Sequence, residues 1–329
     1  MEKIYKVVID TKGSDKGPAA VVKGAVDALA AQPMLAVCLV GDADFIAAEC
    51  ERLGAPTERV EIIDAPDAIT NYDNPAEAIF TKGQSSMVKA LVRVAGDESL
   101  IGLITAGNTG ALLAGSVRYL SGKERVRPAM AAVLPAANGS FTCLVDTGAT
   151  IDCPAATLVH FARLGSDFMK KMYGIESPRV GLLSNGAEPT KGNKVVKETH
   201  QLLLCEQGMN FIGNIEGNNA LSGECDVLVC DGFAGNQVLK VTEGTATRII
   251  TDIVKYAKRT GNPQMMELVG HLMGIYDINS LGGGIILGCA TPVVKVRGSS
   301  GDKAIVSAAQ MLLNMAQNKS VYDKQEYSI

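Results

Sequence analysis

Short apolar runs of four to six residues recur along the chain and alternate with longer amphipathic stretches. The runs are apolar at nearly every position, which is typical of strands that are buried on both faces of a parallel sheet. Several helices have readable ends: Asp42 caps one that ends near Gly54, and Pro154 opens another that runs to about Tyr173 before Gly174. Alternating strands and helices predict an α/β fold with three αβα layers and a mostly parallel sheet. The predicted strands are Lys6–Asp10, Leu35–Val40, Val60–Asp64, Leu100–Thr105, Ala131–Leu134, Thr142–Asp146, Arg179–Leu183, Asn210–Gly213, Asp226–Cys230 and Val293–Val296.

No repeat, low-complexity linker or change of composition divides the 329 residues. The chain is therefore expected to form a single catalytic α/β domain, residues 1–329, or two intertwined subdomains. Two further helices are predicted at Lys191–Cys205 and Ala234–Lys258. The N-terminus leads directly into a strand without a signal-peptide pattern, and no apolar run has the length of a membrane span. A cytoplasmic protein that can still lie on a membrane surface is expected.

The composition argues against several classes of protein. Apolar residues make up 47% and charged residues 20%, so the chain can bury a large core and is not disordered. The net charge of −4, the absence of Trp and an aromatic content of 5% all argue against nucleic-acid binding. Eight Cys without a C-x-x-C motif and three His without paired spacing give no support for a zinc site. We expect buried free cysteines, no metal and no cofactor.

Five predicted strands end in polar loops that contain glycine. Each loop alone is explained by the turn preference of Gly and Asn. Five together indicate a site, because the carboxyl ends of parallel strands share one edge of a sheet, where ligands bind. These strand ends are Asp10, Thr105, Asp146, Ser184 and Asp231.

The loop Gly107-Asn108-Thr109-Gly110 follows a strand and precedes an apolar run that is expected to be helical. Glycines let an anion approach the backbone, and the N–H groups at the start of a helix favour negative charge. The loop is neither G-x-G-x-x-G nor a Walker sequence, so it indicates a small phosphate or a phosphorylated group rather than a dinucleotide or nucleoside triphosphate.

Two further side chains are candidates for chemistry. Lys191 lies just before a helix, where its ammonium can hold a phosphate, although a solvated surface lysine is the ordinary alternative. Asn236 lies at a helix start, where its amide either caps the helix or stabilises an oxyanion. No Ser-His-Asp or Cys-His arrangement stands out, and Cys153 and Cys230 have no evident base, so no covalent intermediate is indicated.

A series of short motifs occurs in one order across most of the chain. The motifs are Ser85-Ser86-Met87, Ala106-Gly107-Asn108-Thr109-Gly110-Ala111-Leu112, Arg127-Pro128, Pro178-Arg179-Val180-Gly181-Leu182-Leu183, Lys191-Gly192-Asn193, Asn210-Phe211-Ile212-Gly213-Asn214-Ile215-Glu216-Gly217, Asp231-Gly232-Phe233-Ala234-Gly235-Asn236 and Gly298-Ser299-Ser300. In this order they resemble the bacterial acyl-[acyl-carrier-protein]:phosphate acyltransferase family, the phosphate acyltransferases of phospholipid synthesis.

The resemblance implies a phosphotransacetylase-like and isocitrate-dehydrogenase-like fold, a homodimer and attachment to the membrane face. It implies that an acyl-carrier-protein thioester reacts with inorganic phosphate to give acyl phosphate, which a downstream glycerol-phosphate acyltransferase then uses. Lys191 and Asn236 match the family's catalytic residues. The substrate-binding residues that the resemblance implies are Gly107, Asn108, Thr109, Gly110, Asp146, Asp231, Gly232, Ser299 and Ser300.

The chain departs from the family's pattern at several positions. The family's first loop usually reads Asp-Ala-Met-Gly-Gly-Asp-x-x-Pro, and an arginine usual near Lys82 is missing. The departures leave open a paralogue that uses another thioester, or a non-catalytic membrane-associated protein that binds acyl carrier. Retention of Lys191 and Asn236 argues against the non-catalytic reading, and the missing dinucleotide loop argues against a nucleotide-dependent dehydrogenase. The other departures are Lys12, Ser14, Lys16, Thr150 and Arg297.

Residues 234–277 are expected to form a long helix and an apolar helical hairpin. The segment Asn262–Asp277 is apolar over most of a helical circumference, so its helix must be covered by core, a partner or lipid. The family has a projecting hairpin in this region that meets the membrane. Basic side chains that are candidates for contact with an acidic carrier or lipid are Lys123, Arg125, Arg127, Lys170, Lys171, Lys255, Lys258 and Arg259.

Overall fold

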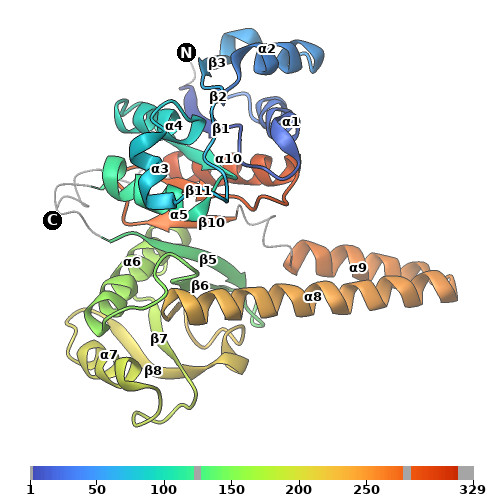
Figure 1. Ribbon diagram of the computed structural model, residues 1–329. Coiled ribbons are helices and arrows are strands. Elements are labelled where there is room, and N and C mark those ends of the chain that lie inside the picture. The colour runs from blue at the N-terminus through green and yellow to red at the C-terminus, as the bar shows by residue number, and fades with distance from the viewer. Residues whose placement is uncertain (1–2, 122–126, 277–282, 318–329) are drawn as a thin grey trace. The chain divides into compact units, whose positions relative to one another are not determined.

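The computed structural model describes residues 3–121, 127–276 and 283–317, and the chain divides into two compact units (Figure 1). The first unit comprises Met1–Pro128 and Leu281–Ile329, and the second comprises Ala129–Ser280. Each unit has a sheet in which one pair of neighbouring strands is antiparallel and the other described pairs are parallel. The predicted αβα fold with a mostly parallel sheet is therefore confirmed. Among the described residues, no helix is both long enough and apolar enough to cross a membrane.

The sheet of the first unit has the strand order β3-β2-β1-β4-β11-β10. Leu35–Gly41 is buried at every position, because helices cover the sheet on both faces. Helices α1, α2 and α10 form one layer, and α3, α4 and α5 form the other (Figure 1). The strands are β1 Tyr5–Asp10, β2 Leu35–Gly41, β3 Val60–Asp64, β4 Leu100–Thr105, β10 Gly284–Leu287 and β11 Val293–Lys295; the α-helices are α1 Gly17–Ala31, α2 Ala43–Arg52, α3 Pro75–Thr81, α4 Ser86–Ala95, α5 Thr109–Gly115 and α10 Asp302–Gln317.

The sheet of the second unit has the strand order β5-β6-β9-β7-β8. Helix α6 packs on β6, β7 and β9 and contacts α7. The start of α8 packs on an apolar cluster that includes Leu134, Leu144 and Leu228. The elements are β5 Ala129–Pro135, β6 Phe141–Val145, α6 Ala155–Tyr173, β7 Arg179–Ser184, α7 Lys194–Leu204, β8 Asn210–Glu216, β9 Val227–Val229, α8 Gly232–Thr260 and α9 Pro263–Tyr276.

The predicted strands are all present, and the expected helix end at Gly174 is confirmed, because this residue adopts the left-handed conformation with φ of 66°. The sequence reading missed β10, which pairs antiparallel with β11. It also started the 191–205 helix too early. Gly192 has φ of 97°, which no helix accommodates, and the Asn193 side chain caps α7 instead.

Helices α8 and α9 pack against each other and extend beyond the strands of the second unit as a two-helix arm (Figure 1). Its second helix buries Val269, whereas Met266, Leu268 and Met273 are about half exposed. The expected apolar helix is thus present but is not enclosed by the core of this chain. Asp277, the last residue of the predicted segment, lies outside the described residues.

Candidate active site

The five polar strand ends fall into two groups, one in each unit. Asp10 and Thr105 end β1 and β4, neighbouring parallel strands of the first unit. In the second unit Ser184 ends β7, and Asp146 and Asp231 follow β6 and β9; these strands are neighbours in the order β6-β9-β7. The expected shared edge is therefore present within each unit, and each group is described separately.

Asp146 organises the loop that follows β6. Its carboxylate is fully buried and accepts backbone N–H groups from Met130 (3.0 Å), Gly148 (3.2 Å), Ala149 (3.0 Å) and Thr150 (2.6 Å). Burial raises the pKa of Asp146, and these hydrogen bonds oppose the rise. Because backbone donors occupy both oxygens, Asp146 positions the loop.

The first turn of α8 packs very closely on this loop. A Cβ at Gly235 would lie 1.9 Å from the Asp146 carbonyl oxygen, and one at Gly232 would lie 2.8 Å from Asp146 Oδ2. The Gly232 N–H donates to the Thr150 carbonyl at 2.7 Å. The glycines at these two positions of the Asp-Gly-Phe-Ala-Gly-Asn motif are therefore required for close packing.

Asn236 lies in the second turn of α8, and its side-chain amide donates to the Thr147 carbonyl at 3.3 Å. It does not cap the helix. Asp231 does so, because its carboxylate accepts the Ala234 N–H at 2.7 Å. A Cβ at Gly148 would lie 3.0 Å from the Asn236 amide nitrogen, so the glycine leaves the space that this amide occupies. Asn236 is half-buried, and its one hydrogen bond holds the amide against the Thr147 loop.

Lys191 lies in a turn between β7 and α7, where its N–H donates to the Glu188 carbonyl at 3.0 Å. The side chain is exposed, so it is not the buried cation that a tightly enclosed phosphate site would have. A Cβ at Gly186 would lie 2.6 Å from Lys191 Cγ, which places the lysine stem directly over this glycine. From β8, Asn214 ties the turn down by donating to the Glu188 carbonyl at 2.9 Å.

One cavity of about 680 Å³ in the second unit is lined by the turn before α7 and by the start of α8. The turn before α7 contributes Asn185, Gly192 and Asn193 to its lining, and the start of α8 contributes Asp231 and Phe233. The two elements that carry Lys191 and Asn236 therefore line the same cavity. This volume lies within the range of small-molecule sites.

Cys230 adjoins the cavity, but it does not have the properties of a nucleophile. Burial raises the pKa of its thiol well above the usual value, and the nearby Asp231 and Asp146 carboxylates add to the rise. A thiol that stays protonated is a poor nucleophile.

In the first unit, Thr105 links the first loop to the Gly107–Gly110 loop. Its hydroxyl donates to Asp10 Oδ2 at 2.8 Å and accepts the Gly107 N–H at 2.9 Å. A Cβ at Gly13 would lie 2.4 Å from the Gly107 Cα, so the two loops contact each other through backbone. Asn108 caps α5 by accepting the Ala111 N–H at 2.9 Å, and α5 has only seven residues.

The sequence reading missed Lys295, the only charged residue of β11. Its ammonium donates to the Ala106 carbonyl at 3.2 Å and the Val296 carbonyl at 2.6 Å. Burial lowers the pKa of Lys295 to about 8, although Asp10 and Asp15 favour its charged form. The sequence did contain an indication of this residue, because a lysine within the apolar run Val293–Val296 predicts a buried charge.

The turn that holds Ser299 and Ser300 packs on the first loop of the same unit. The Asp15 N–H donates to the Gly298 carbonyl at 2.8 Å, and the Ser14 hydroxyl donates to the same carbonyl at 3.2 Å. Ser299 is exposed. The departures at Lys12, Ser14 and Lys16 thus lie in a loop that contacts the predicted substrate-binding turn, while Thr150 supplies only its backbone to Asp146.

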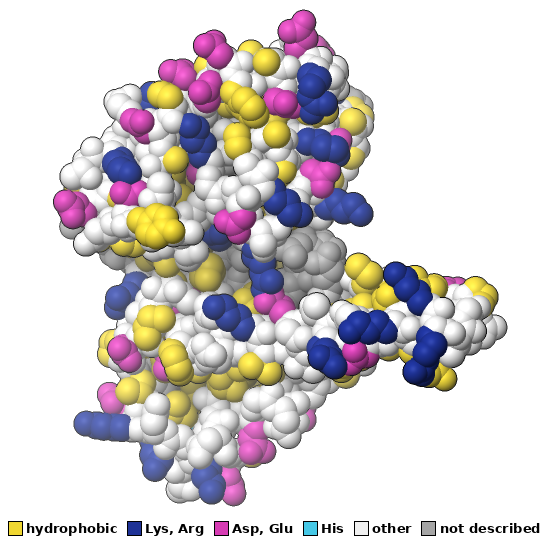
Figure 2. Space-filling model, turned by 45° about the vertical axis from the view of Figure 1, so that its right-hand side comes forward, with side chains coloured by type: hydrophobic (Ala, Val, Ile, Leu, Met, Phe, Trp, Pro, Cys, Tyr) yellow, Lys and Arg dark blue, Asp and Glu magenta, His cyan; other side chains and the backbone are white. Residues whose placement is uncertain are grey.

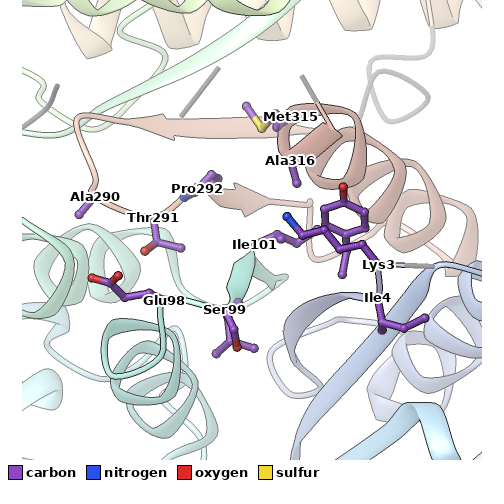
Figure 3. Close-up of a pocket in the computed structure, with 12 residues that line it drawn as sticks. Lys3, Ile4, Glu98, Ser99, Ile101, Ala290, Thr291, Pro292, Met315 and Ala316 are labelled. Carbon is purple, nitrogen blue, oxygen red and sulfur yellow. The ribbon is translucent and has the colours of Figure 1, made fainter. Parts of the chain in front are cut away.

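A second cavity, of about 340 Å³, lies in the first unit at the amino ends of β1 and β4 (Figure 3). It is lined by Tyr5, Leu100, Pro292 and Met315 among others. The polar loops follow the carboxyl ends of the same strands. This cavity is therefore separate from the site that the sequence predicted.

Comparison with known proteins identifies the chain's relatives. A family model described as "fatty acid synthesis protein" matches residues 5–322. The phosphate acyltransferase of Clostridium acetobutylicum is 35% identical over 323 residues, covering 96% of each chain. That of Streptococcus agalactiae is 38% identical over 323 residues, also covering 96% of each. A branched-chain phosphotransacylase from Enterococcus faecalis has the same fold, with a TM-score of 0.59 and 19% identity over 94% of this chain and 98% of its own.

Proposed function

The chain belongs to the fatty acid synthesis protein family and is an acyltransferase, and we propose that it transfers an acyl group from an acyl-carrier-protein thioester to phosphate. The proposed reaction forms acyl phosphate for phospholipid synthesis. A phosphate oxygen attacks the thioester carbonyl carbon, the carbon–sulfur bond breaks, and the carrier leaves as its thiolate. The near-complete coverage of relatives named phosphate acyltransferase supports this assignment.

In the proposed mechanism, Lys191 holds the phosphate. Its ammonium is exposed on the turn whose residues Gly192 and Asn193 line the 680 Å³ cavity, and in this proposal it neutralises the nucleophile's charge as the phosphate approaches the carbonyl. Its exposure lets phosphate exchange with solvent. Gly186 and Asn214 support this role, because they fix the stem and the turn that carry the ammonium.

Asn236 is proposed to stabilise the negative charge that develops on the carbonyl oxygen. One N–H of its amide donates to Thr147, and an amide has a second N–H for the oxyanion. No covalent enzyme intermediate is needed, because phosphate attacks directly. The observation that carries the proposal is that the Lys191 turn and the Asn236 helix line one cavity.

The test is to incubate the protein with acyl-carrier thioester and phosphate and to trap acyl phosphate with hydroxylamine. Hydroxamate that requires both substrates, with release of one carrier thiol for each, is the expected result. A parallel reaction with the coenzyme A thioester identifies the donor. Product from coenzyme A alone would replace the carrier with another thioester, and no product from either would remove the proposed function.

The carrier is acidic, so its proposed contact is a basic surface of this chain. Exposed candidates are Arg127, Lys170 and the α8 group Lys255, Lys258 and Arg259, whereas Lys123 and Arg125 lie outside the described residues. Charge reversal at the contacting group is expected to raise the KM for carrier in a salt-dependent way. Unchanged KM at every group would contradict this contact.

The proposal has three further parts. The protein attaches to a membrane surface, it forms a homodimer, and its acyl phosphate product passes to a glycerol-phosphate acyltransferase. The two-helix arm supports the attachment, since it combines exposed Met266, Leu268 and Met273 with the basic α8 residues. Figure 2 displays hydrophobic and basic side chains together on this arm, at the right of the view.

A further inference from the structure

The 680 Å³ cavity of the second unit has a mainly apolar interior. Leu182 and Leu183 of β7 line it, Val195 and Val196 of α7 form one side, and Val238 of α8 lies on another. Side chains of this kind give no hydrogen bonds to a polar ligand. They favour a ligand with a hydrocarbon part that leaves water when it binds.

The polar side chains of the lining come from the end of β7, from the turn before α7 and from the first two turns of α8, where Gln237 precedes Val238. Asn185 and Asn193 flank the turn that carries Lys191, and Asp231 caps α8. The exposed Phe233 ring adds apolar surface next to Asp231. The cavity therefore joins a polar region beside the candidate catalytic residues to an apolar one, which suits an amphiphilic ligand.

Ser184 marks the polar end of the cavity. It ends β7 and lines the cavity, and its hydroxyl oxygen lies beneath the lining surface with no hydrogen-bond partner among the described residues. An unsatisfied buried hydroxyl is costly, so this end of the cavity favours a ligand group that can form hydrogen bonds. Ser184 lies near the Lys191 turn, because a Cβ at Gly192 would be 3.2 Å from its Oγ.

We propose that this cavity binds the fatty acyl chain of the substrate, with the carbonyl end at Ser184 and the Lys191 turn and the hydrocarbon along Val196 and Val238. The inference rests on the proposed function for the identity of the ligand. The side chains of α7 and α8 would then set the length of chain that the enzyme accepts. Each buried methylene contributes roughly fourfold in affinity, so chain length is a sensitive readout.

The first experiment fills the cavity. Val196→Phe and Val238→Phe are expected to lower kcat/KM for a palmitoyl donor at least tenfold relative to a butyryl donor. Leu202→Phe is the matched control on α7, because Leu202 is 42% exposed and does not line the cavity. The control is expected to keep the wild-type ratio between the two donors.

A second set of variants keeps the test decisive if the larger side chains impair folding. Val196→Ala enlarges the cavity and is expected to shift the preference toward longer chains. Ser184→Ala is expected to raise KM for all chain lengths by a similar factor, since it changes the polar end of the cavity and leaves the apolar side chains unchanged. An unchanged chain-length profile in active Val196 and Val238 variants would overturn the proposal.

Direct binding separates this inference from the proposed function. Calorimetry with palmityl and butyl pantetheine thioethers, which cannot react, measures the affinity of the cavity for each chain without turnover. Tighter palmityl binding that Val238→Phe abolishes would support the cavity even if no acyl phosphate forms. Equal binding of the two analogues would overturn it even if the enzyme is active.

Discussion

The side-chain amide of Asn236 donates a hydrogen bond to the backbone carbonyl of Thr147, 3.3 Å away. The loop that carries Thr147 is itself held by the buried Asp146 carboxylate, and Gly235 lets α8 approach the same loop. The orientation of the amide is thus set before substrate binds. Preorganised donors of this kind stabilise a transition state without paying for reorientation during the reaction.

Asn236→Ala is therefore expected to lower kcat by about 10²–10³, the usual effect of removing one oxyanion donor. Folding should change little, because the amide makes one long hydrogen bond at a half-buried position. The measurement is hydroxamate formation together with a thermal unfolding curve. Lys240→Ala, an exposed change on the same helix, is the control, and turnover within a few-fold of wild type would exclude the assigned role.

Lys191→Ala is expected to raise the KM for phosphate by tenfold or more and to leave the KM for the acyl donor nearly unchanged. Lys191→Arg should recover only part of the loss, since a planar guanidinium replaces a compact charge. Lys194→Ala, three residues further on and also exposed, is the matched control. Steady-state kinetics with phosphate as the varied substrate decide the matter, and equal effects at the two lysines would point to general surface charge.

Gly186→Ala tests whether the position of the Lys191 stem matters. The added Cβ would lie 2.6 Å from Lys191 Cγ, so the flexible side chain has to move. We expect activity to fall about tenfold while the unfolding temperature stays within a few degrees. In a double-mutant cycle, Gly186→Ala should have no further effect in the Lys191→Ala background, and additive losses would show that Gly186 acts elsewhere.

The sequence predicted those parts of the fold and site that depend on local pattern. Buried parallel strands are continuously apolar, so their positions and the loops after them were readable. The sequence did not predict β10, because the short run Gly284–Leu287 forms a strand only by pairing with β11. The sequence also could not predict two tertiary contacts, because folding alone brings their residues together. One is the packing of the Lys191 stem over Gly186, and the other is the hydrogen bond from Asn214 to the Glu188 carbonyl.

Lys295 gives a prediction about stability and pH. Burial lowers its pKa from 10.5 to about 8, whereas the unfolded chain keeps the ordinary value. Between these two values the unfolded state binds more protons than the folded state, so stability contributed by this site rises with pH. Well below pH 8 both states are protonated and the contribution is constant.

The difference in unfolding free energy between wild type and Lys295→Met should therefore shift in favour of wild type by about 1–3 kcal/mol from pH 7.5 to pH 10. Urea unfolding of both proteins at each pH measures it, and titrating groups that do not interact with Lys295 cancel in the difference. Lys303→Met, an exposed change on α10, is the matched control. A flat profile for Lys295→Met would mean that the lysine titrates normally.

The two-helix arm of α8 and α9 leads to the last prediction. A surface helix normally turns its apolar side chains toward the protein, yet Met266, Leu268 and Met273 remain 43–53% exposed on α9. Burial of the exposed half of each side chain in a lipid surface is worth about 0.7–1.5 kcal/mol, and nearby cations add attraction to anionic lipid.

Leu268→Glu combined with Met273→Glu is therefore expected to weaken binding to anionic vesicles at least about 100-fold, since two apolar anchors become charges that the lipid repels. Both positions are exposed, so the fold should survive, and turnover of a soluble short-chain donor should stay within a few-fold of wild type. Leu204→Glu, at a 60% exposed position on α7, should leave vesicle binding intact.

Co-sedimentation with vesicles of mixed anionic and neutral lipid provides the measurement. Full binding by the double variant would exclude α9 as the membrane contact, and loss of vesicle binding together with dissociation into monomers would assign the apolar side chains to a second copy of the chain instead.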